Sequence, residues 1–251
     1  MKLLVDLGNS RLKLARLGAH GVEPIATWAH AAADAAEHLD GALAGVGAVD
    51  SVWIADVARR EAGDRLLGAC ARHLPGARIE RLVTPASGFG VTCAYAEPAR
   101  LGIDRWLALV AAHAHGSGAK LVASLGTALA IDALTGTGGH LGGLITPAPE
   151  LMQRALVQAT GRVQPTAAGR IETFGTSTED GLVSGSWQAC AALIERAWHA
   201  LRERAGEEPA LLLSGGAAPT IAALLAMPHR HVPMLVLEGL ARYAEAGRES
   251  G

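Results

Sequence analysis

The sequence lacks the features that mark proteins that coat nucleic acids, secreted disulfide proteins and membrane proteins. Its 24 acidic and 22 basic residues leave a formal net charge of −2, so no basic excess exists to neutralise nucleic acid phosphates. The three cysteines, Cys70, Cys93 and Cys190, are odd in number and widely spaced, and they form neither a disulfide framework nor a metal pattern. No run approaches the roughly 20 apolar residues of a membrane span, and Asp6 ends the first apolar run before the roughly 7–15 residues of a signal peptide. We therefore expect a cytoplasmic protein that binds neither membrane nor nucleic acid.

The composition favours a globular chain. Half of the 251 residues are hydrophobic and 18% are charged, which is typical of chains that fold around a packed core. Aromatic residues make up only 4%, so alanine, leucine and valine must supply most of that core. At roughly 100–200 residues per domain, the length allows one large domain or two small ones.

Each half of the chain opens with a strand, a glycine turn and a second strand. Leu3 to Leu7 is apolar, a turn follows at Gly8-Asn9-Ser10, and Arg11 to Leu17 alternates polar and apolar residues. Residues 121–132 repeat the pattern, with Gly126 in the place of Gly8. A repeated opening of this kind indicates two similar units.

The flexible segment Gly116-Ser117-Gly118 separates the two halves. Strands alternate with helices on both sides of it, so we expect an α/β fold of two similar domains, residues 1–115 and 116–251, with a cleft between them. Helices are expected at 31–43, 59–73, 99–115, 149–159, 178–205, 219–225 and 237–246, further strands at 22–28, 51–57, 78–83 and 211–214, and a loop at 161–175.

The segment from Asp6 to Lys13 is the first candidate for a functional site. An acid at a strand end beside a glycine turn can hold Mg²⁺ through water, and the N–H groups of the turn can face phosphate oxygens. Lys13 can add positive charge. The same residues fit an ordinary hairpin equally well. No Gly-Lys-Ser/Thr follows, so the segment is not a Walker A loop.

The second candidate is Gly102-Ile103-Asp104-Arg105, at the start of a helical stretch where N–H groups favour anions. The acid and the arginine can serve as general base and anion clamp, although an acid at a helix N-terminus beside a solvated arginine is the commoner case. Other glycine-rich segments fit either ligand contacts or plain turns: Ser124 to Thr127, Gly138 to Gly143 and Ser214 to Gly216. Thr176 to Glu179 fits a helix cap.

In this order and at these separations, the motifs closely resemble those of the type III pantothenate kinases. Asp-x-Gly-Asn-Ser-x-x-Lys spans Asp6 to Lys13, Gly-x-Asp-Arg spans Gly102 to Arg105, Gly-Thr-Ala spans Gly126 to Ala128, and Gly-Gly-x-Ile-x-Pro spans Gly142 to Pro147. The resemblance covers the chain from Lys2 to about Leu240. It implies an actin-like ATPase fold, in which two ribonuclease-H-like domains flank an active-site cleft.

The resemblance also implies an activity, namely MgATP-dependent phosphorylation of pantothenate at its primary hydroxyl, the first step of coenzyme A biosynthesis. It implies that ATP contacts Asp6, Leu7, Gly8, Asn9, Ser10, Arg11, Leu12, Lys13 and Thr127, with Asp6 near the magnesium ion through water. It implies that pantothenate contacts Tyr95, Gly102, Ile103, Asp104, Arg105 and Thr178, with Asp104 as the general base. The family is dimeric, so we expect a homodimer in which Thr178 reaches the partner's site.

One departure from the family bears on its monovalent cation, K⁺ or NH4⁺. The family usually has an aspartate where this chain has Ser124, and an uncharged serine is a weak cation ligand, so potassium dependence is in doubt. Two other functions stay open: a kinase for another small alcohol, against which Tyr95 and Thr178 weigh, and a non-catalytic regulatory homologue. The intact Asp6 and Asp104 argue against the second, whereas Ser124 leaves it open.

Overall fold

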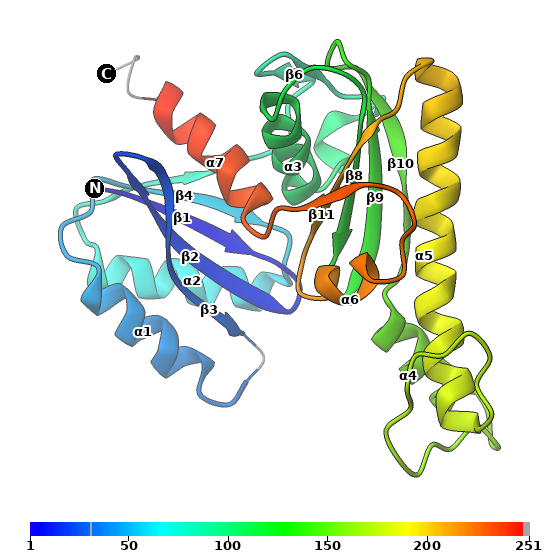
Figure 1. Cartoon of the computed structure of the whole chain (residues 1–251). Coiled ribbons are helices and arrows are strands. Elements are labelled where there is room, and N and C mark those ends of the chain that lie inside the picture. The colour runs from blue at the N-terminus through cyan, green and yellow to red at the C-terminus, as the bar shows by residue number, and fades with distance from the viewer. Residues whose placement is uncertain (31, 248–251) are drawn as a thin grey trace. The chain divides into compact units, whose positions relative to one another are not determined.

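The computed structural model describes residues 1–30 and 32–247 (Figure 1). The chain divides into two compact units, one formed by Met1–His115 with the C-terminal segment from Met234, the other by Gly116–Pro233. Each unit contains one mixed five-stranded sheet with helices packed against it.

The sheet of the first unit has the order β3-β2-β1-β4-β5. Strands β1 (Lys2–Leu7), β2 (Arg11–Gly18) and β3 (Gly21–Ala29) form an antiparallel meander, and β4 (Ser51–Asp56) and β5 (Arg78–Arg81) continue parallel to β1. The helices of this unit are α1 (Ala35–Gly45), α2 (Arg60–His73), α3 (Ile103–Ala114) and α7 (Leu235–Ala246).

Helices cover both faces of this sheet, which is why β1 is apolar almost throughout. Leu3, Val5 and Leu7 pack in one core with residues of α1 and α2. Because side chains alternate along a strand, Leu4 and Asp6 point to the opposite face. Helices α3 and α7 contact the sheet outside that first core. The strand therefore delivers Asp6 to the α3–α7 face.

The second unit repeats this topology with the strand order β10-β9-β8-β11-β12. Strands β8 (Lys120–Leu125), β9 (Ala128–Leu134) and β10 (His140–Pro147) form the meander, and β11 (Ala210–Ser214) and β12 (His229–His231) continue parallel to β8. Its helices are α4 (Pro149–Ala159), α5 (Thr178–Ala205) and α6 (Ala218–Ala222). Cys190, Ile194 and Trp198 of α5 pack on the apolar side chains of β8 and β11.

The two hairpins that open the units are closed in the same way. The N–H of Gly8 donates to the carbonyl of Arg11 at 3.0 Å, and the N–H of Gly126 donates to the carbonyl of Ala128 at 3.0 Å. The first turn is one residue longer. Matching strand orders and matching turns confirm the α/β fold class with two five-stranded sheets.

Several predicted bounds differ from the structure. Position 31, where the first helix was predicted to begin, lies outside the described residues, and α1 begins at Ala35. The helix predicted from residue 99 begins at Ile103, because Pro98–Arg100 forms a separate 3-10 turn. The short strands β6 (Ser87–Gly88), β7 (Val91–Thr92) and β12 were not predicted, since two or three residues carry no readable period.

The C-terminal helix α7 lies in the first unit, whereas the predicted second domain, residues 116–251, contained it. Gly239 is the physical reason, since a Cβ there would lie 2.1 Å from the carbonyl oxygen of Leu107 in α3. The glycine lets the two helix backbones approach closely. Trp106 Nε1 of α3 also donates to Tyr243 Oη of α7 at 2.8 Å.

Among the described residues, no helix combines the length and the apolar character needed to cross a bilayer.

Candidate active site

The β1–β2 hairpin holds an acid and a lysine side by side in the first unit. Asp6 and Lys13 occupy opposite positions in the strand register, so both side chains emerge on the same face of the sheet. Lys13 Nζ lies 3.6 Å from Asp6 Oδ2. Asp6 is buried, and Lys13 remains partly accessible.

The turn between these two strands lies at the surface of the first unit. Asn9, Ser10 and Arg11 are exposed, while Leu7 and Leu12 are buried in the core on either side. A Cβ at Gly8 would lie 3.3 Å from the carbonyl oxygen of Arg11, which is tight for any other residue.

His30, which was not among the predicted site residues, contacts the same turn. His30 Nε2 donates to the carbonyl of Gly8 at 2.8 Å, and the N–H of His30 donates to the carbonyl of Ser10 at 3.2 Å. The only sequence signal for this contact is the position of His30 directly after the strand that pairs with β2.

The N-terminus of α3 carries the second predicted motif, also in the first unit. Gly102 is the N-cap residue, and a Cβ there would lie 2.6 Å from Asp104 Oδ1. Asp104 Oδ1 accepts a hydrogen bond from the N–H of Arg105 at 2.8 Å. The Asp104 carboxylate therefore folds back over the first turn of the helix, in space that only a glycine leaves open, while Ile103 is buried in the core.

Tyr95 and Arg105, which were predicted to bind the same substrate, contact each other. Arg105 is 8% exposed, and its Nη1 donates to Tyr95 Oη at 3.2 Å. The guanidinium carbon also lies 5.9 Å from the centre of the Tyr95 ring, within cation–π range. A buried arginine held by a phenol is a preorganised binding group for a carboxylate or phosphate.

The electrostatics of Asp6 connect the two motifs. Burial raises the pKa of Asp6 to about 6; the Lys13 ammonium opposes this rise, and the Asp104 carboxylate adds to it. The effect of Asp104 on Asp6 means that the two carboxylates are close enough to repel each other. Such a pair disfavours double ionisation and attracts a cation.

The remaining predicted residues belong to the second unit. Thr127 lies in the β8–β9 turn, and its carbonyl accepts the N–H of Ala148 at 3.2 Å. Ser124 of β8 lies beside Ser214 of β11 in the parallel register. Gly215 has a φ of 94°, and a Cβ there would lie 2.1 Å from the carbonyl oxygen of Leu125, so the turn after β11 packs tightly on the end of β8.

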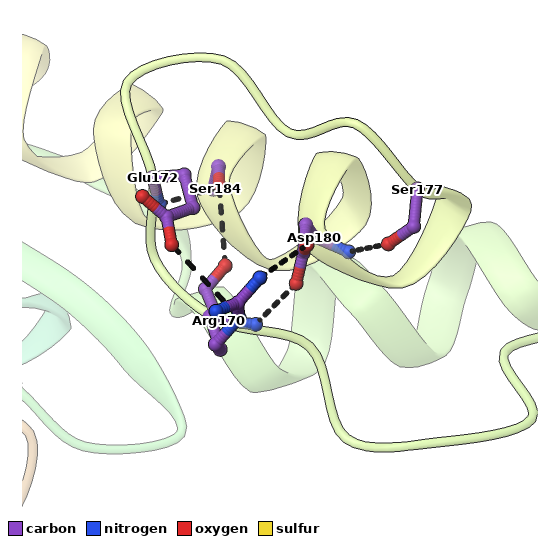
Figure 2. Close-up of polar contacts among 5 residues, drawn as sticks. All are labelled: Arg170, Glu172, Ser177, Asp180 and Ser184. Carbon is purple, nitrogen blue, oxygen red and sulfur yellow. Dashed lines mark hydrogen bonds and ion pairs between the residues drawn. The ribbon is translucent and has the colours of Figure 1, made fainter.

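Thr178 is the first residue of α5, as the sequence predicted. The cap is made by the preceding residue, since Ser177 Oγ accepts the N–H of Asp180 at 3.0 Å (Figure 2). This is the usual N-cap geometry, in which a serine satisfies a free N–H of the first turn.

Comparison with known proteins agrees with this arrangement. The sequence profile of the type III pantothenate kinase family matches residues 2–200. The chain is 38% identical over 246 residues to the type III pantothenate kinase of Thiobacillus denitrificans, an alignment that covers 98% of this chain and 97% of the relative. It is 40% identical over 252 residues to that of Chromobacterium violaceum, covering 97% and 99%.

Among solved structures, a Campylobacter jejuni protein provisionally described as a Baf family transcriptional activator matches 98% of this chain and 99% of its own. The TM-score is 0.62 and the sequence identity is 18%. At that identity the likeness shows the fold alone.

Proposed function

Because the chain belongs to the type III pantothenate kinase family, we propose that Asp104 is the general base of the phosphoryl transfer that it catalyses. The activity itself follows from the family: the enzyme uses ATP to phosphorylate pantothenate, the first step of coenzyme A biosynthesis. Asp104 accepts the proton of the pantothenate hydroxyl as that oxygen bonds to the γ-phosphorus, and the bond from phosphorus to ADP breaks.

The observation that carries this assignment is the placement of Asp104. Its carboxylate is fixed by the Arg105 N–H over the first turn of α3, where Gly102 leaves room for it. A fixed carboxylate can stay within hydrogen-bond reach of a bound hydroxyl, which general-base catalysis requires.

The other predicted residues divide into two binding groups. Arg105 and Tyr95, which already contact each other, bind pantothenate together with Gly102, Ile103 and Thr178. The segment Asp6 to Lys13 and Thr127 bind the phosphates of ATP. The hairpin supports this role, since its turn is exposed and Lys13 of β2 remains partly accessible.

Magnesium fits the donor chemistry at Asp6. A carboxylate oxygen is a hard ligand of the kind Mg²⁺ prefers, and the repulsion between Asp6 and Asp104 is what a divalent cation would offset. No cluster of three or more His, Cys, Asp or Glu side chains that could hold a metal occurs within residues 1–30 and 32–247. Asp6 would therefore hold the ion through water. The ion would neutralise charge on the phosphates as the transfer proceeds.

We further propose a homodimer in which Thr178 of one subunit contacts pantothenate bound to the other, and a cytoplasmic location. A monovalent cation would be held only weakly, because Ser124 replaces the charged ligand usual in the family.

Asp104→Asn tests the proposal. The amide cannot accept a proton, so kcat should fall by about 10²–10⁴-fold while ATP binding is retained. Asp64→Asn on the exposed side of α2 is the matched control, since its ion pair with Arg60 is a surface pair and contributes little. ADP release is measured with and without pantothenate. Near-normal kcat in Asp104→Asn would remove Asp104 from the mechanism.

A further inference from the structure

The segment between α4 and α5 is held against α5 through its backbone (Figure 2). Asp180 Oδ1 accepts the N–H of Arg170 at 2.8 Å. Ser184 Oγ accepts the N–H of Glu172 at 2.9 Å and donates to the carbonyl of Arg170 at 3.2 Å. Gln188 Nε2 donates to the carbonyls of Glu172 and Thr173, at 2.7 and 3.2 Å.

Asp180, Ser184 and Gln188 are spaced four residues apart, so they form one stripe along the helix. We call these three side chains the clasp. The clasp bonds main-chain groups of the loop, and the Arg170 side chain adds an ion pair, with its Nη2 3.5 Å from Asp180 Oδ2. Asp180 and Ser184 are 8% and 3% exposed, which shields these hydrogen bonds from water.

Two glycines make this close approach possible. A Cβ at Gly169 would lie 2.3 Å from the carbonyl oxygen of Glu179, and a Cβ at Gly175 would lie 2.4 Å from the backbone nitrogen of Gly181. Real side chains do not tolerate such distances to backbone, so any other residue would push the loop off the helix.

The loop held by the clasp leads through residues 174–177 into Thr178, the first residue of α5. At one end Gln188 holds Thr173, and at the other Ser177 Oγ accepts the N–H of Asp180. This segment has little apolar anchorage of its own, because Phe174 is 86% exposed. Its position therefore depends on the polar contacts of α5.

We propose that the clasp positions Thr178 for pantothenate binding, so that Asp180, Ser184 and Gln188 are positioning residues of this kinase. The inference rests on the proposed role of Thr178. Releasing the clasp should weaken pantothenate binding without changing ATP binding, since it frees only the loop that leads into Ser177 and Thr178 at the start of α5.

Two variants release the loop by different means. Ser184→Ala removes the hydroxyl that bonds Glu172 and Arg170, and Gly169→Ala wedges the loop from Glu179 while leaving the clasp side chains intact. Gly161→Ala is the matched control in the same loop, because a Cβ there meets nothing within 4 Å. Asp180→Asn keeps an acceptor oxygen, so it should raise KM for pantothenate less than Asp180→Ala does.

The measurements are KM for pantothenate, KM for ATP, kcat, and the rate of tryptic cleavage after Arg170. We expect both releasing variants to be cleaved faster and to raise KM for pantothenate by about five- to tenfold, with KM for ATP within about twofold of wild type. Gly161→Ala should behave as wild type.

Three results would overturn the inference: faster cleavage with unchanged KM for pantothenate, unchanged cleavage in both variants, or a parallel loss of kcat, both KM values and thermal stability. Thr178→Ala is measured alongside. If it leaves KM for pantothenate unchanged, the assigned role of Thr178 fails; if it raises KM and the releasing variants do not, only the clasp fails.

Discussion

The burial of the Asp6 carboxylate allows a quantitative prediction about the free energy of unfolding. Its pKa of about 6 lies about two units above the usual aspartate value, because burial outweighs the Lys13 ammonium and Asp104 adds repulsion. At 1.36 kcal/mol per unit, ionised Asp6 costs the folded state about 3 kcal/mol relative to the protonated form.

The sign of the effect sets a pH window. Below about pH 4 the carboxyl is protonated in both the folded and the unfolded chain. Between about pH 4 and pH 6 the unfolded chain releases this proton first, so the free energy of unfolding falls as pH rises. Above about pH 6 both states are ionised, and the destabilisation by Asp6 is complete.

Asp6→Asn places a neutral group of the same size at this position. We expect the unliganded variant to be more stable than wild type at pH 8 by about 1–3 kcal/mol, which for a chain of this length corresponds to a Tm about 2–10 °C higher. At pH 4.5 about a third of the difference should remain, because the carboxyl is then largely ionised in the unfolded chain but still protonated in the folded one. Turnover with pantothenate should nevertheless collapse, because the variant lacks the carboxylate proposed to face magnesium.

Thermal unfolding of the unliganded enzyme at pH 4.5 and pH 8 provides the assay, with Asp64→Asn as control. A lower Tm for Asp6→Asn at pH 8, or the same shift at both pH values, would refute the reasoning, because burial of charge would then not dominate at Asp6. Adding Asp104→Asn should reduce the gain from Asp6→Asn, since the repulsion between the carboxylates is then already gone.

Three further predictions concern the other site residues. Wild-type activity should respond weakly to potassium, and Ser124→Asp should strengthen the response; strong activation of wild type would show that the cation is held without that carboxylate. Gly102→Ala should lower kcat by about 10²-fold with ATP binding unchanged, because its Cβ would lie 2.6 Å from Asp104 Oδ1; near-normal kcat would show that the carboxylate can move without loss. Co-expressed Asp104→Asn and Thr178→Tyr chains, each inactive alone, should regain about a quarter of wild-type activity through mixed dimers; no recovery would place both residues in one subunit's site.

Local signals predicted much of the fold. The bounds of α5, 178–205, agree with the sequence because Ser177 caps its start and Gly206, at a φ of 71°, ends it in the left-handed conformation. The β1–β2 and β8–β9 hairpins were predicted from their glycine turns. These elements are determined by neighbouring residues, which a sequence displays directly.

Features that depend on distant contacts were not predictable in the same way. The unit to which α7 belongs is decided by Gly239 against Leu107, more than a hundred residues away. The clasp residues have a visible four-residue spacing. Their partners are backbone groups of a loop, and residue types do not indicate which backbone groups accept or donate such hydrogen bonds. His30 likewise bonds a carbonyl, so its role appears only in three dimensions.

The two units differ in the charged residues that they place beside their opening hairpin turns. In the first unit Asp6 stands opposite Lys13 across the hairpin, and in the second Ser124 stands opposite Ala130. A buried acid needs a nearby cation, whereas a hydroxyl does not, so Ser124 can stand opposite the uncharged Ala130. One fold, used twice, therefore places an ionised pair beside the turn of the first unit and only a small polar group beside that of the second. This asymmetry is why Asp6, and not Ser124, is the position where magnesium chemistry is expected.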